Sequence, residues 1–433
     1  MAEFLLVDRA MWLFEESSGC KLHRDPTAGK CKFLALGRWR GTLTQEDLPC
    51  NFFSISDHLD MLGVTLKATH TQTRKANGDD LQDKIKAVVG PWKAGKFMPL
   101  TMRPFSLNTY ALPKLWHKCN TIDLRVGDIN AINKQAKAWL YADLLEKPEE
   151  LALYRQPVEG GLGLHHVQLR ALAYQISCFL ETSCNPVYKR NQYHEALLQY
   201  HVLGEDIPVP DPPPYFKGEV FPTIRRLHAT PLSLKKVSLK EIYRFLIEEF
   251  TIQEEEPGTR TLKPFRTELA NPETPWDSVW PSSRQYMLGP SLCSFLFKLL
   301  HQILPTAQRV ARILPNQSPS CTRCRLETPE TIQHALLECP DNQGVGTVLH
   351  NGLKKYLPNL TRNMILTLNY TVEEDLKFSI VWTTAAFLST VWNLRIEKKK
   401  VDLIRIRAKM EASCRLLRES RLAKTTEMLS QIF

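Results

Sequence analysis

The stretch from Cys321 to Cys339 constrains this chain more than any other, because it places four soft or borderline metal ligands within nineteen residues. Cys321 and Cys324 form a Cys-x2-Cys knuckle, a tight turn that directs two sulfurs at one point. His334 lies on a segment that is predicted to be helical. Pro340 disfavours a helical conformation for Cys339, so we expect the helix to stop there and the chain to turn this sulfur inward.

These four side chains are predicted to bind zinc tetrahedrally, since knuckle spacing followed by a second ligand pair is typical of zinc sites. Because protein fills all four positions, the site is predicted to be structural, with no open position for an activated water. The alternative is four unpaired residues buried in a reduced chain, because cysteine is among the most buried residue types. The spacing favours zinc.

The residues on both sides of the knuckle carry a family resemblance. Upstream the chain reads Phe295-Leu-Phe-Lys-Leu-Leu-His-Gln-Ile-Leu-Pro-Thr-Ala-Gln-Arg-Val-Ala-Arg312, and downstream Glu330-Thr-Ile-Gln-His334 leads to Cys339. An amphipathic helix, a Leu-Pro-Thr corner and an Arg before Cys-x2-Cys, closed by Glu-Thr-x-x-His, resemble the zinc-binding segment of non-LTR (LINE-type) retrotransposon reverse transcriptases.

Residues 1–70 resemble the end of a reverse-transcriptase palm. A helix is predicted at 9–17, a strand at 31–36 and a second strand at 60–66, with Gly63 at a close backbone approach. In the family the Leu-Gly strand helps to form the primer grip, so the resemblance implies a primer-grip-like role for Leu62, Gly63 and Val64. It also implies that Lys30 or Lys32 contacts an incoming nucleotide. Taken alone, these elements fit a fragment of any α+β domain.

Residues 71–200 are predicted to be helical and resemble the thumb of the same polymerases. Helices are expected at 80–88, 106–112, 126–145 and 167–180. Asp79 and Asp80, in a polar Asn-Gly-Asp-Asp sequence, are predicted to cap the first of them. The Gly160-Gly-Leu-Gly-Leu164 stretch is predicted to be a turn before a helix rather than a phosphate loop, because no strand precedes it and no Lys-Ser/Thr follows.

The remaining chain divides into three predicted parts. Residues 201–275 form a spacer with a proline-rich stretch at 207–214 and an amphipathic helix at 239–250. Residues 276–345 form the zinc-binding segment, in which Trp276 and Trp280 are expected to be packing anchors, although stacking on bases is the alternative. Residues 346–433 form a basic helical region.

The formal charge of +10 and the pI near 9.0 suit a polyanionic partner. A buried helix is predicted at 371–393 and a basic amphipathic helix at 395–424, which holds eleven Lys and Arg against four acids. The alternative is a solvated helix docked through its apolar stripe. The predicted nucleic-acid contacts are Arg323 and Arg325 on the knuckle, and Arg395, Lys398, Lys399, Lys400, Arg405, Arg407 and Lys409.

The chain lacks the aromatic-Ala-Asp-Asp turn that holds catalytic metals in the resembled family; Tyr141-Ala-Asp143 continues with Leu144. We therefore assign no catalytic residues and expect no DNA synthesis by this chain alone. The sequence predicts a mainly α protein with a small α+β N-terminal remnant, a helical thumb, a zinc knuckle and long C-terminal helices. The predicted identity is a truncated, nucleic-acid-binding reverse transcriptase; the alternative is a host-recruited zinc-containing interaction module.

No secretory signal or membrane-spanning run is evident at the sequence level, since the apolar stretch at 380–391 is too short to cross a bilayer. The eleven cysteines are scattered along the chain. We therefore expect an intracellular protein, cytoplasmic or nuclear, with thiols rather than disulfides. Oligomeric state is not indicated by the pattern.

Overall fold

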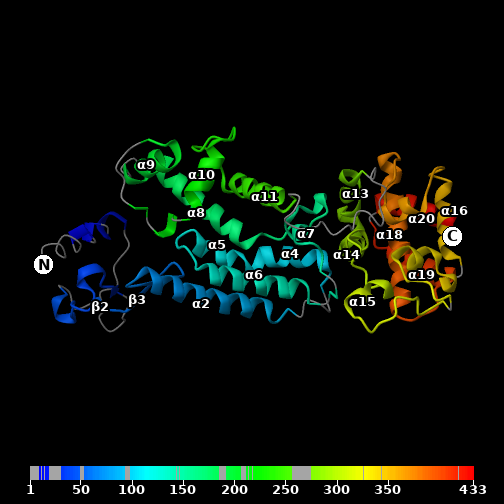
Figure 1. Ribbon diagram of the computed structural model, residues 1–433, viewed down its shortest axis with the longest axis horizontal. Coiled ribbons are helices and arrows are strands. Elements are labelled where there is room, and N and C mark those ends of the chain that lie inside the picture. The colour runs from blue at the N-terminus through cyan, green and yellow to red at the C-terminus, as the bar shows by residue number, and fades with distance from the viewer. Residues whose placement is uncertain are drawn as a thin grey trace. The chain divides into compact units, whose positions relative to one another are not determined.

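The computed structural model describes residues 9–10, 12–13, 15–18, 31–48, 53–92, 98–142, 144–145, 147–184, 192–205, 211–212, 214–216, 218–255, 275–324, 326–342, 344–417 and 419–433. This part of the chain is mostly helical and has two short two-stranded sheets near its N-terminal end (Figure 1). The predicted fold class is confirmed. No helix among these residues is long and apolar enough to cross a membrane.

The chain divides into two compact units, each made of three segments. Unit 1 comprises Met1–Pro91, Tyr110–Gln135 and Val167–Leu246, and unit 2 comprises Trp92–Thr109, Ala136–His166 and Ile247–Phe433. The five-part linear division expected from the sequence stays a prediction.

Unit 1 contains both sheets. Strand β1 (Cys31–Phe33) pairs in parallel with β2 (Phe53–Ile55), and β3 (His58–Met61) pairs antiparallel with β4 (Val64–Lys67). The described residues within 9–18 are helical. Lys32 lies on β1 and is exposed, whereas Lys30 lies outside the described residues.

The strand predicted at 60–66 is wrong, because these residues form a hairpin. Met61 pairs with Val64, so Leu62 and Gly63 make a two-residue turn with φ values of 50° and 80°. Such left-handed backbone is required in the turns that match strand twist. A Cβ on Gly63 would lie 4.0 Å from the His117 ring, in ordinary contact. Gly63 is therefore favoured by its φ angle and not by a close approach.

Helix α2 (His70–Val89) begins earlier than predicted. Its N-cap is Thr69, whose side chain accepts from the Gln72 backbone N–H at 3.3 Å. Asp79 and Asp80 therefore lie inside the helix, and their predicted role as N-caps is wrong.

The other helices of unit 1 pack around aromatic residues of α8 and α10. They are α5 (Pro113–Cys119), α8 (Val167–Cys184), α9 (Gln192–Leu198) and α10 (Val220–His228). Helix α6 (Val126–Leu140) begins in unit 1 and ends in unit 2, and α11 (Leu239–Glu255) does the same. Phe179 meets Phe216 and Phe221 edge to face at the centre of this core.

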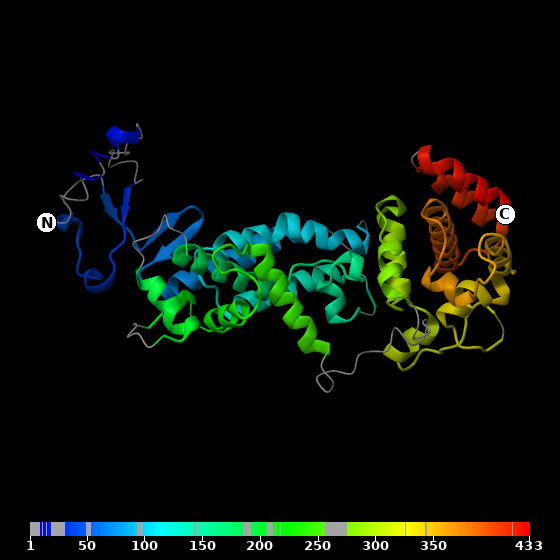
Figure 2. The same ribbon diagram turned by 90° about the horizontal axis from the view of Figure 1, so that it is seen from above.

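Unit 2 is built on α18 (Glu374–Ile396), which is buried over most of its length as predicted for this segment. Helices α19 (Leu403–Cys414) and α20 (Glu419–Ile432) pack beside it (Figures 1 and 2). The remaining helices are α4 (Arg103–Ser106), α7 (Glu150–Tyr154), α13 (Trp276–Ser283), α14 (Gly289–Leu300), α15 (Ala307–Ile313), α16 (Val345–Lys354) and α17 (Arg362–Thr367).

Short turns of other helix types connect these elements. The 3-10 turns are Gly37–Trp39, Gln45–Asp47, Leu100–Met102, Pro157–Glu159, Pro214–Phe216, Tyr286–Leu288 and Pro340–Asn342, and the π-helical turns are Leu107–Ala111, Gln199–Leu203 and His334–Glu338.

The single basic helix predicted at 395–424 is wrong. Helix α18 ends at Ile396, and Lys398 adopts a left-handed φ of 55°. Asp402 then caps α19, because its Oδ1 accepts from the Arg405 backbone N–H at 2.9 Å. Helix α20 is a third, separate element. The basic residues of this stretch are therefore divided among the end of α18, a turn, α19 and α20.

The packing interpretation is confirmed for Trp280, whereas Trp276 is half-buried. The Trp280 ring is buried and stacks on Trp276 and His301, at centroid distances of 5.0 and 5.1 Å. Gly160 has a φ of 87°, and a Cβ there would lie 2.4 Å from the Trp280 ring. The glycine-rich stretch is therefore a turn packed under a tryptophan.

Candidate metal centre

A pair of backbone hydrogen bonds shapes the knuckle. The N–H of Cys321 donates to the Thr328 carbonyl at 2.9 Å, and the N–H of Glu330 donates to the Pro319 carbonyl, also at 2.9 Å. These bonds close the loop that carries Cys321 and Cys324, and both cysteines are buried.

The second ligand pair is brought together by the π-helical turn His334–Glu338. The Cys339 N–H donates to the His334 carbonyl, five residues back, at 2.8 Å. Such a wide turn brings the two residues closer to one face than an α-helical turn does. Cys339 leaves the helix with a ψ of 123°. The predicted stop before Pro340 is confirmed, whereas the π-helical turn itself has no signal in the sequence.

The four ligand atoms have the spacing of a tetrahedral zinc site. All lie within 4.8 Å of one another in buried residues. The sulfurs of Cys321 and Cys339 are 3.8 Å apart, and Cys324 Sγ is 3.3 Å from His334 Nε2. Zn–S bonds of about 2.3 Å and Zn–N bonds of about 2.0 Å place such atoms about 3.5–3.8 Å apart. The donor set therefore fits a closed, structural zinc, with His334 binding through Nε2.

The two ends of the cluster differ in their affinity for protons. Burial opposes a charge on Cys321, but backbone N–H groups of Cys324 and Arg323 and the Arg395 guanidinium outweigh it and lower the pKa of this thiol to about 6. Burial and the neighbouring sulfurs raise the pKa of Cys339 to about 12. Metal binding therefore has to displace protons, most of all from Cys339, because the ligand is the thiolate.

Comparison with known protein families agrees with this geometry. Residues 265–345 match the zinc-binding domain of reverse transcriptases. The match contains all four ligands and lies in unit 2. No curated protein matches the chain.

Two cations that are predicted to contact nucleic acid form contacts within the protein that hold the zinc-binding domain in place. Arg395 Nη2 lies 3.3 Å from Cys321 Sγ, and its guanidinium forms an ion pair with Glu330. Arg323 donates to Asp341 Oδ2 at 2.7 Å and to the Lys399 carbonyl at 3.0 Å. Both arginine side chains are largely buried, so neither offers a free surface charge.

The other predicted contacts have different environments. Arg325 lies outside the described residues. Exposed side chains belong to Lys398, Lys399, Lys400, Arg405, Arg407 and Lys409. Sequence reasoning missed Asp341 and the role of Glu330. The only signal for Glu330 was its place in the Glu-Thr-x-x-His motif, because its partner Arg395 lies far along the chain.

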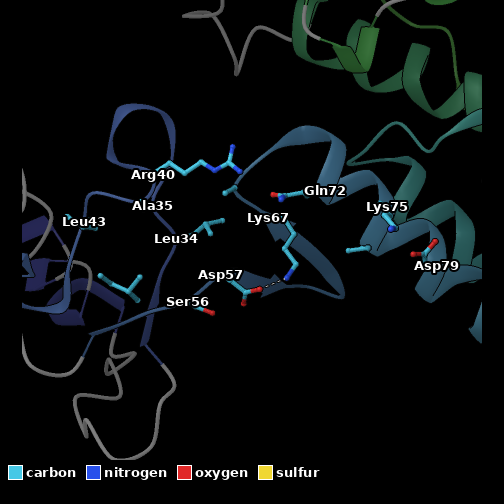
Figure 3. A pocket seen from close by; sticks show the side chains of 14 residues that line it. Leu34, Ala35, Arg40, Leu43, Ser56, Asp57, Lys67, Gln72, Lys75 and Asp79 are labelled. Atoms are coloured by element: carbon cyan, nitrogen blue, oxygen red, sulfur yellow. Dashed lines mark hydrogen bonds and ion pairs between the residues drawn. The ribbon is translucent and has the colours of Figure 1, made fainter.

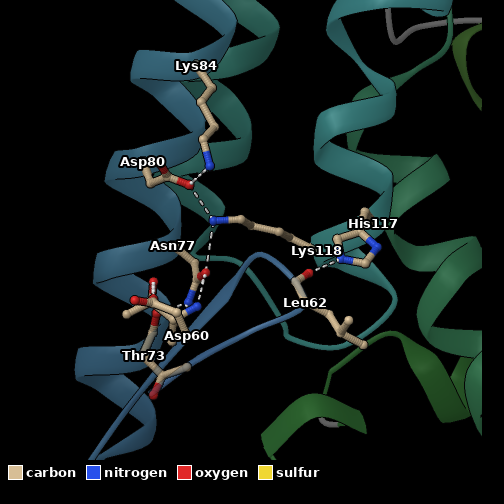
Figure 4. Close-up of polar contacts among 9 residues, drawn as sticks. Asp60, Leu62, Thr73, Asn77, Asp80, Lys84, His117 and Lys118 are labelled. Atoms are coloured by element: carbon tan, nitrogen blue, oxygen red, sulfur yellow. Dashed lines mark hydrogen bonds and ion pairs between the residues drawn. The ribbon is translucent and has the colours of Figure 1, made fainter. Parts of the chain in front are cut away.

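Leu62, Gly63 and Val64, for which the resemblance implies a primer-grip-like role, lie at the tip of the β3–β4 hairpin in unit 1. The Leu62 carbonyl accepts from His117 Nε2 at 2.5 Å (Figure 4). The Leu62 side chain is 85% exposed, whereas Val64 is buried. Asn77 of α2 holds β4 through both the N–H and the carbonyl of Thr65, at 3.0 and 2.7 Å. The hairpin is thus fixed from two helices, while its tip is open to solvent.

A cavity of about 630 Å³ lies elsewhere in unit 1 (Figure 3). Its lining includes the cations Arg40, Lys67 and Lys75 and the acids Asp57 and Asp79. Lys67 is paired with Asp57 at 2.8 Å. The three cations and two acids leave this lining with a formal charge of only +1.

Proposed function

We propose that this chain is part of a non-LTR retrotransposon reverse transcriptase and that its zinc-binding domain and the adjoining helices bind nucleic acid. The match of residues 265–345 supports a reverse-transcriptase origin. A group of exposed cations beside the knuckle supports nucleic-acid binding. We call residues 397–402, which join α18 to α19, the basic turn.

The basic turn is anchored to the knuckle and to α19, and this anchoring is the observation that carries the proposal. Arg323, between the two knuckle cysteines, donates to the Lys399 carbonyl at 3.0 Å. Arg405 donates to the Lys400 carbonyl at 3.3 Å, and Val401 is buried. The backbone of the turn is thereby fixed, while its lysine side chains extend into solvent.

The charge of this surface is only partly compensated. Its six exposed cations, Lys398, Lys399, Lys400, Arg405, Arg407 and Lys409, have three acids beside them, Glu397, Asp402 and Glu411. Glu397 lies 2.9 Å from Lys399 and 3.5 Å from Lys409, but exposed pairs of this kind contribute little, so a phosphate can replace the carboxylate. Within the described residues, Lys398 and Lys400 form no ion pair with a carboxylate.

Phosphate neutralisation predicts a measurable salt dependence. Lysine and arginine that neutralise phosphates release condensed counterions, so affinity falls with salt. Engagement of about three to five phosphates gives a log–log slope of about −2 to −4.5, depending on strand type.

The test compares two triple variants of the full chain, each titrated with single-stranded RNA and DNA at several salt concentrations. One replaces Lys398, Lys399 and Lys400 with alanine. The control replaces the exposed lysines Lys235, Lys236 and Lys240 of unit 1. We expect the first variant to bind more weakly with a slope shallower by about 2 to 3, and the control to match the wild type. Equal slopes for all three proteins would move the binding site elsewhere, for instance to the unit 1 cavity.

A protein partner is the second candidate, because large apolar side chains are exposed at the ends of the basic turn. Ile404, at the start of α19, is 82% exposed, and Ile396, at the end of α18, is 59% exposed. A protein-binding surface would lose affinity on Ile404→Ser while showing little dependence on salt. A nucleic-acid surface would show the reverse.

A further inference from the structure

Arg395 occupies an unusual position for an arginine. It lies in the last turn of α18, beside the metal cluster, and it is only 8% exposed. Burying a guanidinium is costly unless negative groups and hydrogen bonds compensate it. Two such groups are present, the Cys321 sulfur at 3.3 Å and the Glu330 carboxylate.

Glu330 connects this arginine to a third element. Its Oε2 accepts from the Ala307 N–H at the start of α15, at 2.5 Å, while its other oxygen faces Arg395. Glu330 itself is buried. The carboxylate is therefore held from both sides, and it fixes the direction in which the guanidinium points.

We propose that Arg395 is a positioning residue of the zinc centre, which donates a hydrogen bond to the metal-bound Cys321 thiolate and is oriented for that task by Glu330. A zinc ion with three thiolates and a neutral imidazole carries one net negative charge, and this charge is buried. The Arg395 guanidinium supplies the opposite charge at one sulfur. Outer hydrogen bonds of this kind orient metal ligands and tune the affinity for the metal.

The same contact couples the metal to the C-terminal helices. Arg395 belongs to α18, which forms one buried core with residues of α19 and α20. Arg323 makes a second connection, from the knuckle to the Lys399 carbonyl. Zinc binding therefore stabilises the end of α18 and the basic turn as well as the knuckle.

A purely structural ion pair between Arg395 and Glu330 is the competing explanation, and a matched control separates the two. Arg362 pairs with Glu338 at 2.7 Å in the same unit, but the pair is exposed, and among the described residues Arg362 bonds to Glu338 and not to a ligand sulfur or imidazole. Arg395→Met keeps side-chain length and removes the charge. Arg395→Lys keeps the charge, and Arg362→Met removes an arginine that does not contact sulfur.

The experiment measures zinc affinity of the full chain by competition with a chelator, together with the thiolate-to-metal absorption of the cobalt(II)-substituted proteins. For Arg395→Met we expect zinc affinity to fall about 10- to 100-fold and the cobalt charge-transfer band to move to lower energy, because the thiolate loses a hydrogen-bond donor. Arg395→Lys should recover part of both effects, and Arg362→Met should change neither.

Unchanged zinc affinity and an unchanged cobalt spectrum in folded Arg395→Met would overturn the proposal. Where Arg395→Met does not fold, zinc affinity is measured for Arg395→Lys and Glu330→Gln instead. Wild-type zinc affinity in both variants would also overturn the proposal. The wild type gives an independent readout. Zinc removal should speed hydrogen exchange at residues 391–402, and exchange unchanged there would contradict the coupling. None of these readouts requires nucleic acid, so the proposed function can fail separately.

Discussion

Asn77→Ala is expected to release the β3–β4 hairpin from α2. Asn77 is fully buried, and its side chain bonds both backbone groups of Thr65, the Lys118 ammonium at 2.9 Å and the Thr73 carbonyl at 2.8 Å (Figure 4). Lys118 keeps Asp80 as a partner in the variant, so it is not left as an isolated charge.

The magnitude follows from these partners. The two bonds to Thr65 and the one to Lys118 contribute about 1 kcal/mol each. The Thr73 carbonyl adds little, because it lies within the helix. Alanine recovers about 0.7 kcal/mol of helix propensity. The net loss is about 2 kcal/mol, which corresponds to about 30-fold faster exchange of amides protected by hairpin docking.

Hydrogen exchange of β3 and β4, followed by mass spectrometry, is the assay. Asn133→Ala is the matched control, because Asn133 also lies on a helix of unit 1 and its buried Oδ1 accepts no hydrogen bond from a described residue. We expect faster hydrogen exchange of the β3 and β4 amides in Asn77→Ala, and exchange at the wild-type rate in Asn133→Ala. Identical exchange in wild type and Asn77→Ala would refute the view that this side chain holds the hairpin.

Three further outcomes are expected. Purified protein should contain about one zinc per chain, and Cys324→Ser should lose it in metal analysis; zinc-free wild type with unchanged melting would contradict the site. Burial lowers the pKa of His166 to about 4, so its neutral form contributes to the free energy of unfolding. This contribution is complete above about pH 6.5 and is lost as the pH falls through 4, by up to about 3 kcal/mol. In His166→Phe, the free energy of unfolding measured with urea should depend less on pH over this range. Gly78→Ala should destabilise, since its Cβ would lie 2.1 Å from Asp128, whereas Gly127→Ala, which meets open space, should stabilise by about 0.5–1 kcal/mol in the same titration.

Local spacing made the metal centre and the buried helix predictable from the sequence. Two cysteines three residues apart are close enough to bind one metal from a turn, and Pro340 marks the position at which the second ligand pair leaves its helix. The run at 380–391 is mostly apolar and is therefore stable only when it is removed from water, and this part of α18 is buried. These features depend on residues that are neighbours in the chain.

The predictions that were wrong concern residues whose contacts lie far away in the sequence. Asn77 and Gly78 carry the composition of a turn, yet they lie inside α2, because Thr65 satisfies the Asn77 amide and Asp128 packs against Gly78. The hairpin turn was missed for the opposite reason. Leu62 adopts a φ of 50° although leucine seldom does so, and the sequence therefore gives no turn signal there.

Counting Lys and Arg residues in the C-terminal region fails for the same reason. The C-terminal cations are predicted to lie on one basic helix, but composition does not distinguish a lysine in solvent from an arginine bonded to a sulfur. Arg395 reaches a cysteine 74 residues away in the sequence. Only the fold separates the cations that hold the knuckle from those that are open to a ligand.

Lysine footprinting of the full-length, zinc-loaded protein tests the central claim most directly. Acetylation with and without single-stranded RNA or DNA, read by mass spectrometry, reports which amines the nucleic acid covers. We expect protection of Lys398, Lys399 and Lys400, with Lys235 and Lys236 modified equally in both states. Protection confined to Lys67 and Lys75 at the unit 1 cavity, with the basic turn fully reactive, would contradict the assignment of nucleic-acid binding to the zinc knuckle and its adjoining turn.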